Sequence, residues 1–353
     1  MSDLLQKAQE FLQNKLPFVL YSKPNETQIV GLFQKDESLN FTEDFTEKGF
    51  VFAPFDGEKF VLIPENNATV LVENYEKKTE AIISELSEEI NFSAKENFEN
   101  LVQKGIDAIH SEEFKKVVLS RTEAVSLEHD NAILLFQKLL SNYPTAFKYC
   151  FFHPKIGLWL GATPEQLLKL NSDEIRTVAL AGTQVFKEGE IIWESKEKEE
   201  QQFVTDFILD SLNDLVTVKI HTEPYTFRAG NIVHIKTDIS AKLIDKKDLK
   251  KVLKILHPTP AVCGLPKKES KDFILKNEGY NREYYAGFLG ELNKDFAKNQ
   301  ENSSDFFVNL RCMKLENKTA NLFIGCGITK DSNPEKEFFE TVNKSKTMKK
   351  ILA

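Results

Sequence analysis

Two charged residues lie beside apolar runs, where a fold could draw them into a site. Lys116 opens KVVLSR at 116–121, and Glu165 follows a Gly-Ala-Thr-Pro turn in LWLGATPEQLLKL at 158–170. A lysine that serves as a base must lose its proton near neutral pH, which partial burial or a neighbouring cation favours. A carboxyl group held against apolar neighbours keeps its proton and can serve as an acid. Singly, each is more often an ordinary strand-edge or turn charge; together they are candidates for general base and general acid.

Two pairs of glutamates occur at helical spacing. Glu197 and Glu200 lie at i, i+3 in KEKEEQQFV, and Glu337 and Glu340 repeat that spacing in EKEFFETVNKS, where Lys344 continues the same face. A charge run usually forms a solvated helix face, and one pair alone would indicate no more than that. Two such pairs on two helices are the arrangement expected for Mg²⁺, which takes a few carboxylates, keeps waters and bridges to an anionic substrate.

Other residues could hold an anion. Arg311 lies in the apolar segment FFVNLRCM, which we interpret as a strand, and an arginine there needs a carboxylate from the protein or from a substrate. AGT at 181–183 and GCG at 325–327 place small residues at expected strand ends, where backbone N–H groups can approach a carboxylate. His234 and His257 are interpreted as core or loop residues.

Composition limits the class of protein. The 353 residues carry a net charge of −8, which argues against a general nucleic-acid-binding surface. The four cysteines are far apart and indicate neither a zinc site nor a disulfide framework. The N-terminal residues predict a short amphipathic helix capped by Ser2 or Asp3 rather than a signal peptide. No apolar run approaches the roughly 20 residues that cross a bilayer, so we expect a cytoplasmic protein.

Strand-like and helical patterns interleave along the chain. Strands are expected throughout 17–65 and again at 284–292, and a helix is expected over 74–110 with Gly105 as its break. A charged helix over about 193–214 should carry a buried apolar stripe made of Phe203, Val204, Phe207 and Ile208. This alternation with hairpin-length gaps predicts an α+β fold with mainly antiparallel sheets.

The C-terminal helix has a clear start. Asn333 is a good cap, Pro334 suits the first helical position, and the glutamates that follow favour the positive end of the helix dipole. We therefore expect Glu337 and Glu340 to lie near the start of a stable helix.

In this order, the blocks resemble the chorismate-utilising family of isochorismate synthases, salicylate synthases and the large subunits of anthranilate and aminodeoxychorismate synthases. The similarity runs from about residue 100 to 350. It implies two antiparallel sheets packed face to face with helices outside. Residues 1–95 would be the N-terminal part of the same fold and 96–353 the chorismate-binding catalytic region, within one continuous domain.

The resemblance also assigns roles to residues. It implies Mg²⁺ held by the two glutamate helices, with Glu200 and Glu340 at the principal ligand positions and Glu197 and Glu337 supporting them. One departure concerns this block, which commonly reads Arg-x-Glu-His or Arg-x-Glu-Asn in the family and here reads KEEQ at 198–201. The ligand glutamate Glu200 is present, and Gln201 can still donate a hydrogen bond.

Two positions separate branches of the family. Lys116 resembles isochorismate and salicylate synthases, whereas ammonia-using members usually carry glutamine or another residue there. The loop HPTPAVCGLP also resembles isochorismate synthases, with Ala261 where aminating members tend to have threonine. By the same matching, positions that contact substrate are occupied by Thr183, Ala261, Arg311, Gly325 and Lys344.

The resemblance thus implies an isomerase that converts chorismate reversibly into isochorismate with Mg²⁺, for menaquinone or siderophore biosynthesis. A salicylate synthase, which adds pyruvate loss, remains an alternative; an anthranilate or aminodeoxychorismate synthase fits less well. A non-enzymatic chorismate-binding regulatory protein is the alternative from another class. We expect a monomer or weak dimer that binds neither nucleic acid nor membranes.

Overall fold

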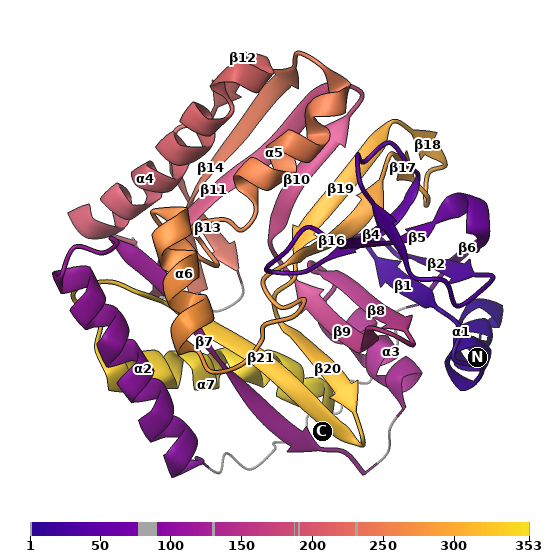
Figure 1. Ribbon diagram of the computed structural model, residues 1–353, viewed down its shortest axis with the longest axis horizontal. Coiled ribbons are helices and arrows are strands. Elements are labelled where there is room, and N and C mark those ends of the chain that lie inside the picture. The colour runs from indigo at the N-terminus through magenta and orange to yellow at the C-terminus, as the bar shows by residue number, and fades with distance from the viewer. Residues whose placement is uncertain are drawn as a thin grey trace.

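The computed structural model describes residues 2–76, 90–128, 131–186, 188–189, 191–229 and 232–352, without the side chains of residues 183, 185, 196, 229 and 232. Two large antiparallel sheets form its centre, and helices lie around them (Figure 1). This architecture confirms the predicted α+β fold.

The first sheet runs through nine strands of the described chain. Its long central pair, β7 and β21, is joined in antiparallel register from Val117↔Ile328 to Ser126↔Thr319. In spatial order the strands are β15 (Gly264–Leu265), β7 (Lys116–Ser126), β21 (Thr319–Ile328), β20 (Cys312–Glu316), β9 (Gly157–Thr163), β8 (Phe147–His153), β1 (Phe18–Ser22), β2 (Gln28–Gln34) and β6 (Ala68–Asn74).

The second sheet mixes strands from both ends of the sequence. In spatial order they are β12 (Val216–His221), β14 (Ile232–Leu243), β11 (Glu174–Val185), β10 (Gln166–Asn171), β19 (Ser303–Val308), β16 (Phe288–Leu292), β4 (Gly49–Ala53), β5 (Phe60–Pro64) and β3 (Asn40–Thr42), with β13 (Tyr225–Ala229) paired to β14. A small ribbon joins β17 (Lys294–Asp295) to β18 (Gln300–Glu301).

The described helices cover the edges and outer faces of the sheets. They are α1 (Asp3–Gln13), α2 (Phe92–His110), α3 (Ala132–Asn142), α4 (Ser195–Ser211), α5 (Leu249–Leu256), α6 (Lys267–Asn277) and α7 (Pro334–Leu352), with short 3-10 turns at Glu65–Asn67, Asn213–Leu215 and Lys246–Asp248. Ser2 caps α1, because its side chain accepts a hydrogen bond from the Leu5 amide. Asn333 accepts one from Lys336 N at 3.0 Å, as the predicted cap of α7 requires.

Apolar side chains fill the space between the sheets and the space behind the first one. Between the sheets, the rings of Phe52 and Phe151 stack with centroids 4.3 Å apart, and those of Phe147 and Phe307 with centroids 4.4 Å apart. A second core lies on the other face of the nine-stranded sheet, beneath α1, α3 and α7. The first sheet therefore has a core on each face, and a strand such as β1 is buried at all five of its positions.

Three expected boundaries are wrong. Residue 74 ends β6, and α2 begins only at Phe92, with residues 77–89 outside the described part. Gly105 lies within α2, where a Cβ would sit 3.1 Å from Leu119 Cδ1, so the glycine permits close packing on β7 instead of breaking the helix. β16 starts at Phe288 rather than 284, because Ala286 has a positive φ of 59° that a strand does not accommodate.

The apolar stripe expected on α4 is only partly buried. Val204 and Ile208 are buried, but Phe203 is 45% exposed and lies under the Lys115 ammonium, 4.8 Å from the ring centroid. α4 packs on β11 and β14.

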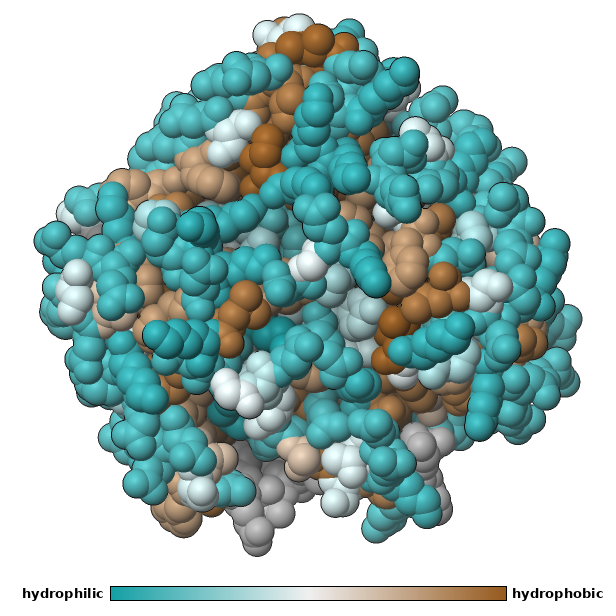
Figure 2. Space-filling view, in the orientation of Figure 1, coloured by the Kyte–Doolittle hydropathy of each residue, from teal (hydrophilic) through white to brown (hydrophobic). Residues whose placement is uncertain are grey.

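The surface is mainly hydrophilic on the face shown in Figure 2, with hydrophobic side chains gathered over the end of the molecule that carries β12 and α5. None of the described helices is both long and apolar enough to span a membrane. All four cysteines are free and buried.

Candidate active site

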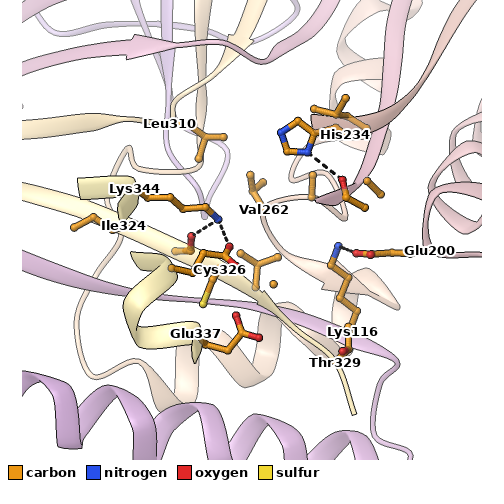
Figure 3. A pocket seen from close by; sticks show the side chains of 18 of the residues that line it. Lys116, Glu200, His234, Val262, Leu310, Ile324, Cys326, Thr329, Glu337 and Lys344 are labelled. Atoms are coloured by element: carbon orange, nitrogen blue, oxygen red, sulfur yellow. Dashed lines mark hydrogen bonds and ion pairs between the residues drawn. The ribbon is translucent and has the colours of Figure 1, made fainter. Parts of the chain in front are cut away.

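A cavity of about 420 Å³ is lined by β7 and β21 of the first sheet and β11 and β14 of the second, with walls from α4 and α7 (Figure 3). The predicted site residues that line it are Lys116, Glu165, Glu197, Glu200, Ala261, Arg311, Gly325, Glu337, Glu340 and Lys344. The side chain of Thr183 lies outside the described part, although its backbone pairs with His234 on the neighbouring strand. Residues from seven segments of the chain thus converge on one cavity.

Glu165 lies in the short link between β9 and β10. Its carbonyl accepts a hydrogen bond of 2.9 Å from Val308 N, which fixes the backbone against β19. Burial raises the pKa of its carboxyl group to about 7, although Arg311, Lys116 and Lys344 act in the opposite direction. Glu165 can therefore carry a proton near neutral pH, as a general acid must.

Lys116 is the first residue of β7, as predicted, and its side chain crosses the cavity toward α4. Its ammonium group forms an ion pair with Glu200 (Figure 3). Ser270 donates a hydrogen bond of 2.9 Å to the Lys116 carbonyl. Leu265 of β15 lies opposite Lys116 in the antiparallel pairing of β15 with β7. A Cβ at Gly327 would lie 3.2 Å from Lys116 Cε, so the glycine leaves room for the lysine chain.

The glutamates reach the cavity from two helices. Glu197 and Glu200 come from α4, and Glu337 and Glu340 from α7. Lys344 donates to Glu340 Oε1 at 2.6 Å and to the Gly325 carbonyl at 3.1 Å. Burial raises the pKa of Glu337.

These residues fit a divalent cation in charge and chemistry. Across the described ranges, no three His, Cys, Asp or Glu side chains lie close enough together to form a finished metal centre. The carboxyl side chains of the cavity nevertheless outnumber the basic ones: Glu165, Glu197, Glu200, Asp331, Glu337 and Glu340 face Lys116, Arg311, Lys336 and Lys344. Glu197 Oε2 is buried and has no hydrogen-bond partner among the described atoms. An uncompensated buried carboxylate oxygen suits a hard cation.

Arg311 does not lie in a strand, which corrects the prediction. It occupies the turn between β19 and β20 with a φ of 48°, and its carbonyl accepts a hydrogen bond of 3.0 Å from Ala162 N. A left-handed backbone at a residue other than glycine is uncommon and costs energy. Burial lowers the pKa of Arg311, with Glu340 and Glu165 acting in the opposite direction. Its guanidinium is suited to a carboxylate ligand.

The two glycine turns lie in the last residues of their strands, close to the predicted ends, because β11 ends at Val185 and β21 at Ile328. Gly182, with a φ of 67°, lies where the register of β11 shifts against β14, and its carbonyl lies 3.1 Å from His234 Nδ1. Gly325 lies within β21, and a Cβ there would lie 2.7 Å from the Tyr285 hydroxyl. Both glycines therefore permit close approach of neighbouring groups to the cavity wall.

Other cavity residues were not predicted to form part of the site. His234 lines the cavity, and burial lowers its pKa. The sequence could have indicated His234, because it alternates with the apolar Val233 and Ile235 and must therefore face the other side of β14 from these buried residues. Tyr285 and Lys336 also line the cavity, but nothing in their local sequence marks them.

A buried ion pair supports the cavity from behind. Arg282 contacts Glu278 and donates to the carbonyls of Val118 and Val262 at 2.7 and 3.0 Å. Glu278 in turn accepts from the Ser120 amide at 2.7 Å. The pair joins β7, which carries Lys116, to the loop that carries Ala261.

The sequence matches the chorismate binding enzyme family over residues 58–353. The chain belongs to this family. The resemblance expected from the sequence is thereby confirmed.

Curated relatives support the same family. The chain is 32% identical over 266 residues to the salicylate biosynthesis isochorismate synthase of Pseudomonas aeruginosa, a match that covers 72% of this chain and 54% of that protein. It is 26% identical over 264 residues to the isochorismate synthase EntC of Escherichia coli K12, covering 71% of this chain and 66% of that protein. The chain thus spans less than two thirds of the length of these relatives.

Solved structures share the fold. The putative 2,3-dihydroxybenzoate-specific isochorismate synthase of Bacillus anthracis superimposes with a TM-score of 0.78 at 22% identity, covering 99% of each chain. The anthranilate synthase component I of Streptococcus pneumoniae gives a TM-score of 0.69 at 18% identity, covering 94% of this chain and 92% of that one. At such identities the likeness concerns architecture only.

Proposed function

We propose that the chain is an isochorismate synthase, an isomerase that converts chorismate reversibly into isochorismate. The observation that carries this proposal is that Lys116 and Glu165 line one cavity, and that burial raises the pKa of Glu165 to about 7. A base and a proton-carrying acid in one cavity are what a water addition coupled to loss of a hydroxyl group needs. The relatives named isochorismate synthase support the choice of reaction.

In this mechanism, Lys116 removes a proton from a water molecule as the water oxygen bonds to ring carbon 2. The ring double bonds shift, and the bond from carbon 4 to its hydroxyl oxygen breaks. Glu165 gives its proton to that oxygen, which leaves as water from the opposite face. Each group contributes to the rate by holding or accepting a proton at the reacting atom.

The substrate carboxylates would be held by the cations of the cavity. Arg311 offers a planar guanidinium from its turn, and Lys344 extends from α7 beside Gly325. Ala261 would leave room for the ring at the loop side, and Thr183 would contact the substrate from β11. Together these residues orient the ring between Lys116 and Glu165.

We further propose Mg²⁺ as the cofactor, held by Glu200 and Glu340 with Glu197 and Glu337 supporting through waters. When bound, Mg²⁺ would coordinate the ring carboxylate and stabilise charge as the double bonds shift. The unpaired Glu197 oxygen and the excess of carboxylates support this proposal. Glu200 pairs with Lys116 and Glu340 pairs with Lys344, so these two carboxylates lie beside the lysines that would act on water and substrate.

We also propose one continuous domain, because β1, β2 and β6 complete one sheet and β3, β4 and β5 complete the other around strands from residues 96–353. A cytoplasmic monomer or weak dimer that binds neither nucleic acid nor membranes remains the proposed state of the protein. Menaquinone and siderophore biosynthesis both remain open as pathways.

Incubation with chorismate and Mg²⁺, followed by chromatography and mass spectrometry, tests the function. We expect a product with the mass of chorismate and the retention of isochorismate, and no product after EDTA treatment. Salicylate would show the rival pyruvate-releasing activity, and an aminated product formed only with ammonium would show an aminating synthase. Calorimetric binding of chorismate without turnover would instead indicate a regulatory protein.

A further inference from the structure

One edge of β7 is completed by groups that do not belong to a full neighbouring strand. On one side β21 pairs with β7 from Val117 to Ser126, whereas on the other side β15 is only two residues long. The backbone groups of an antiparallel strand alternate between its two sides, so the amides and carbonyls on the second side need other partners. Lys116 is the first residue of β7, and its placement depends on how this edge is held.

The first part of this edge is fixed by β15, by α6 and by the end of the loop before β15. β15 pairs with β7 only at Lys116 and Val117. Ser270 of α6, which is fully buried, donates a hydrogen bond of 2.9 Å to the Lys116 carbonyl. The Val118 amide donates to the Cys263 carbonyl at 2.8 Å. The start of β7 is thus held by backbone and side chain together.

Farther along β7, an ion pair takes the place of a neighbouring strand. Arg282 donates to the Val118 carbonyl at 2.7 Å, and the Ser120 amide donates to Glu278 at 2.7 Å. The Ser120 hydroxyl donates to the same carboxylate at 2.9 Å. A carbonyl and an amide at these positions are the groups that the next strand of a sheet would otherwise satisfy. The pair therefore continues the edge of the sheet beyond β15.

The same guanidinium also reaches the loop that carries Ala261. Arg282 Nη1 donates to the Val262 carbonyl at 3.0 Å, and Nε donates to Glu278 Oε2 at 2.7 Å. Val118 and Val262 both line the active-site cavity. An arginine presents its donors in a planar fork of fixed geometry, whereas a lysine ends in a single ammonium group. Arg282 thus ties two walls of the cavity to each other.

The burial of this pair points to a geometric role. The side chains of Arg282 and Glu278 are only 2% and 1% exposed. Removing two charges from water costs free energy that their attraction offsets only in good geometry, so a buried ion pair is by itself weak evidence for stability. Its hydrogen bonds instead fix the backbone of β7 next to the general base.

We propose that Arg282, oriented by Glu278, is a positioning residue for Lys116. The inference rests on the proposed function. Side chains two residues apart on a strand point to the same face, so a displacement of Val118 carries Lys116 with it inside the cavity. Misplacing a reacting group by about 1 Å can lower turnover by about 10²-fold. By holding Val118, Arg282 keeps Lys116 across the cavity from Glu165.

Arg282→Lys tests this role, because it keeps a cation beside Glu278 but cannot supply the fork that reaches both carbonyls. We expect kcat for chorismate to fall by about 10- to 100-fold, with KM changed by less than about threefold. The fold should remain intact by circular dichroism at the assay temperature. A merely structural role would lower the melting temperature and leave kcat per folded molecule unchanged.

A double-mutant cycle shows whether Arg282 acts through Lys116. In the Lys116→Ala background, Arg282→Lys should lower kcat by less than about twofold more, because the group that it positions is gone. In the Glu165→Gln background, it should cause its full loss. Losses that multiply equally in both backgrounds would overturn the proposal, since Arg282 would then act independently of Lys116.

A milder variant probes the same edge without disturbing a charge. Ser270→Ala removes the hydrogen bond to the Lys116 carbonyl and should lower kcat by about fivefold, with the same dependence on Lys116. This variant keeps the test decisive if Arg282→Lys does not fold. Parent-like kcat in Ser270→Ala and in any folded Arg282→Lys protein would overturn the proposal.

The matched control is another buried ion pair. Lys23 pairs with Glu291 and Asp295 outside the active-site cavity, so Lys23→Met should lower the melting temperature and leave kcat within about twofold of the parent value. An equal loss of kcat in Lys23→Met would show that any disturbed buried pair slows the enzyme, which would contradict a specific role for Arg282. If the parent protein does not convert chorismate, the proposed function fails and this inference fails with it. If parent and Lys116→Ala behave as expected but Arg282→Lys keeps its kcat, only the positioning role fails.

Discussion

Two clusters of ionisable side chains in this protein contain similar groups in different settings: one lines an open cavity, and the other is buried between the sheets. One is the active-site cavity with Glu165 and Lys116. The other, called here the buried cluster, consists of Tyr21, Lys23, Glu291 and Asp295 between the sheets. Burial raises the pKa of both Glu165 and Glu291 to about 7.

The neighbours of the two glutamates differ. Glu291 accepts hydrogen bonds from the Tyr21 hydroxyl at 2.6 Å and the Phe296 amide at 3.0 Å, and Lys23 forms ion pairs with Glu291 and Asp295. Glu165 instead faces an open cavity in which carboxyl side chains outnumber basic ones. A raised carboxyl pKa therefore does not identify a catalytic acid, whereas a raised pKa beside an open cavity with unequal numbers of acidic and basic groups does.

Removing the acid should have the largest effect. Glu165→Gln keeps the shape of the side chain but cannot donate the proton, so kcat should fall by about 10²–10⁴. Glu291→Gln, at the glutamate with the same raised pKa, should change kcat less than about threefold. Steady-state kinetics with chorismate measure both, and similar losses in the two variants would abolish the distinction between the clusters.

Removing the base should have an effect of similar size. Lys116→Ala should lower kcat by about 10²–10⁴ with the fold intact by circular dichroism. The matched control is Lys148→Met, because burial lowers the pKa of Lys148 to about 8 although it lies outside the cavity and donates to the Lys23 carbonyl at 3.1 Å. Near-normal turnover in Lys116→Ala would refute its role as the base.

The buried cluster should matter for stability instead. Glu291→Ala leaves Lys23 buried with one carboxylate fewer, and breaking a buried ion pair costs about 3–5 kcal/mol. Urea unfolding measures this loss in free energy of unfolding. Glu200→Gln breaks the Lys116 pair in a more exposed setting and should cost about 1 kcal/mol or less. A larger loss for Glu200→Gln than for Glu291→Ala would reverse the comparison.

Metal affinity should follow the cavity glutamates. Glu200→Gln and Glu340→Gln should each weaken Mg²⁺ binding at least tenfold, because each removes a charged oxygen ligand. Titration calorimetry measures the affinity without turnover. Asp295→Asn, in the buried cluster, is the control and should bind Mg²⁺ as the parent protein does; equal affinities in all variants would exclude these glutamates as ligands.

The pH dependence should show the smallest and most specific effect. An acid must be protonated to act, so kcat/KM should fall about tenfold per pH unit above pH 7, where Glu165 loses its proton, and this group should impose no loss below that pH. The alkaline decline should vanish in Glu165→Gln. It should persist in Glu291→Gln, since the proton on Glu291 takes no part in the chemistry. If the alkaline decline vanished in Glu291→Gln and persisted in Glu165→Gln, the titrating group would be Glu291 and the role of Glu165 as the acid would be refuted.

The fold class could be predicted because strand-like runs, helical spacing and hairpin-length gaps are local signals, and they hold in elements such as β7, β14 and α7. The interpretations of Gly105 and Arg311 were wrong, because local sequence signals do not report contacts between distant segments. Gly105 was interpreted as a break, yet its role is to let α2 approach Leu119, a contact distant in sequence. Arg311 was interpreted as part of a strand, although Asn309 and Arg311 form the turn between β19 and β20.

The sequence was sufficient to predict which residues belong to the site, but not which of their side chains contact one another. The order of the blocks indicated Lys116, Glu165 and the glutamate helices, and the structure brings these residues to one cavity. The pairing of Lys116 with Glu200 joins residues 84 positions apart, and no local pattern encodes it. The same holds for the buried contact of Arg282 with the Val118 carbonyl.

The central claim is that water adds at carbon 2 while the hydroxyl leaves carbon 4 in this cavity. Turnover of chorismate with Mg²⁺ in H₂¹⁸O, stopped at low conversion and analysed by mass spectrometry, tests it most directly. The account predicts isochorismate with one ¹⁸O atom, bound to carbon 2. Isochorismate without ¹⁸O, or no isochorismate at all, would contradict it.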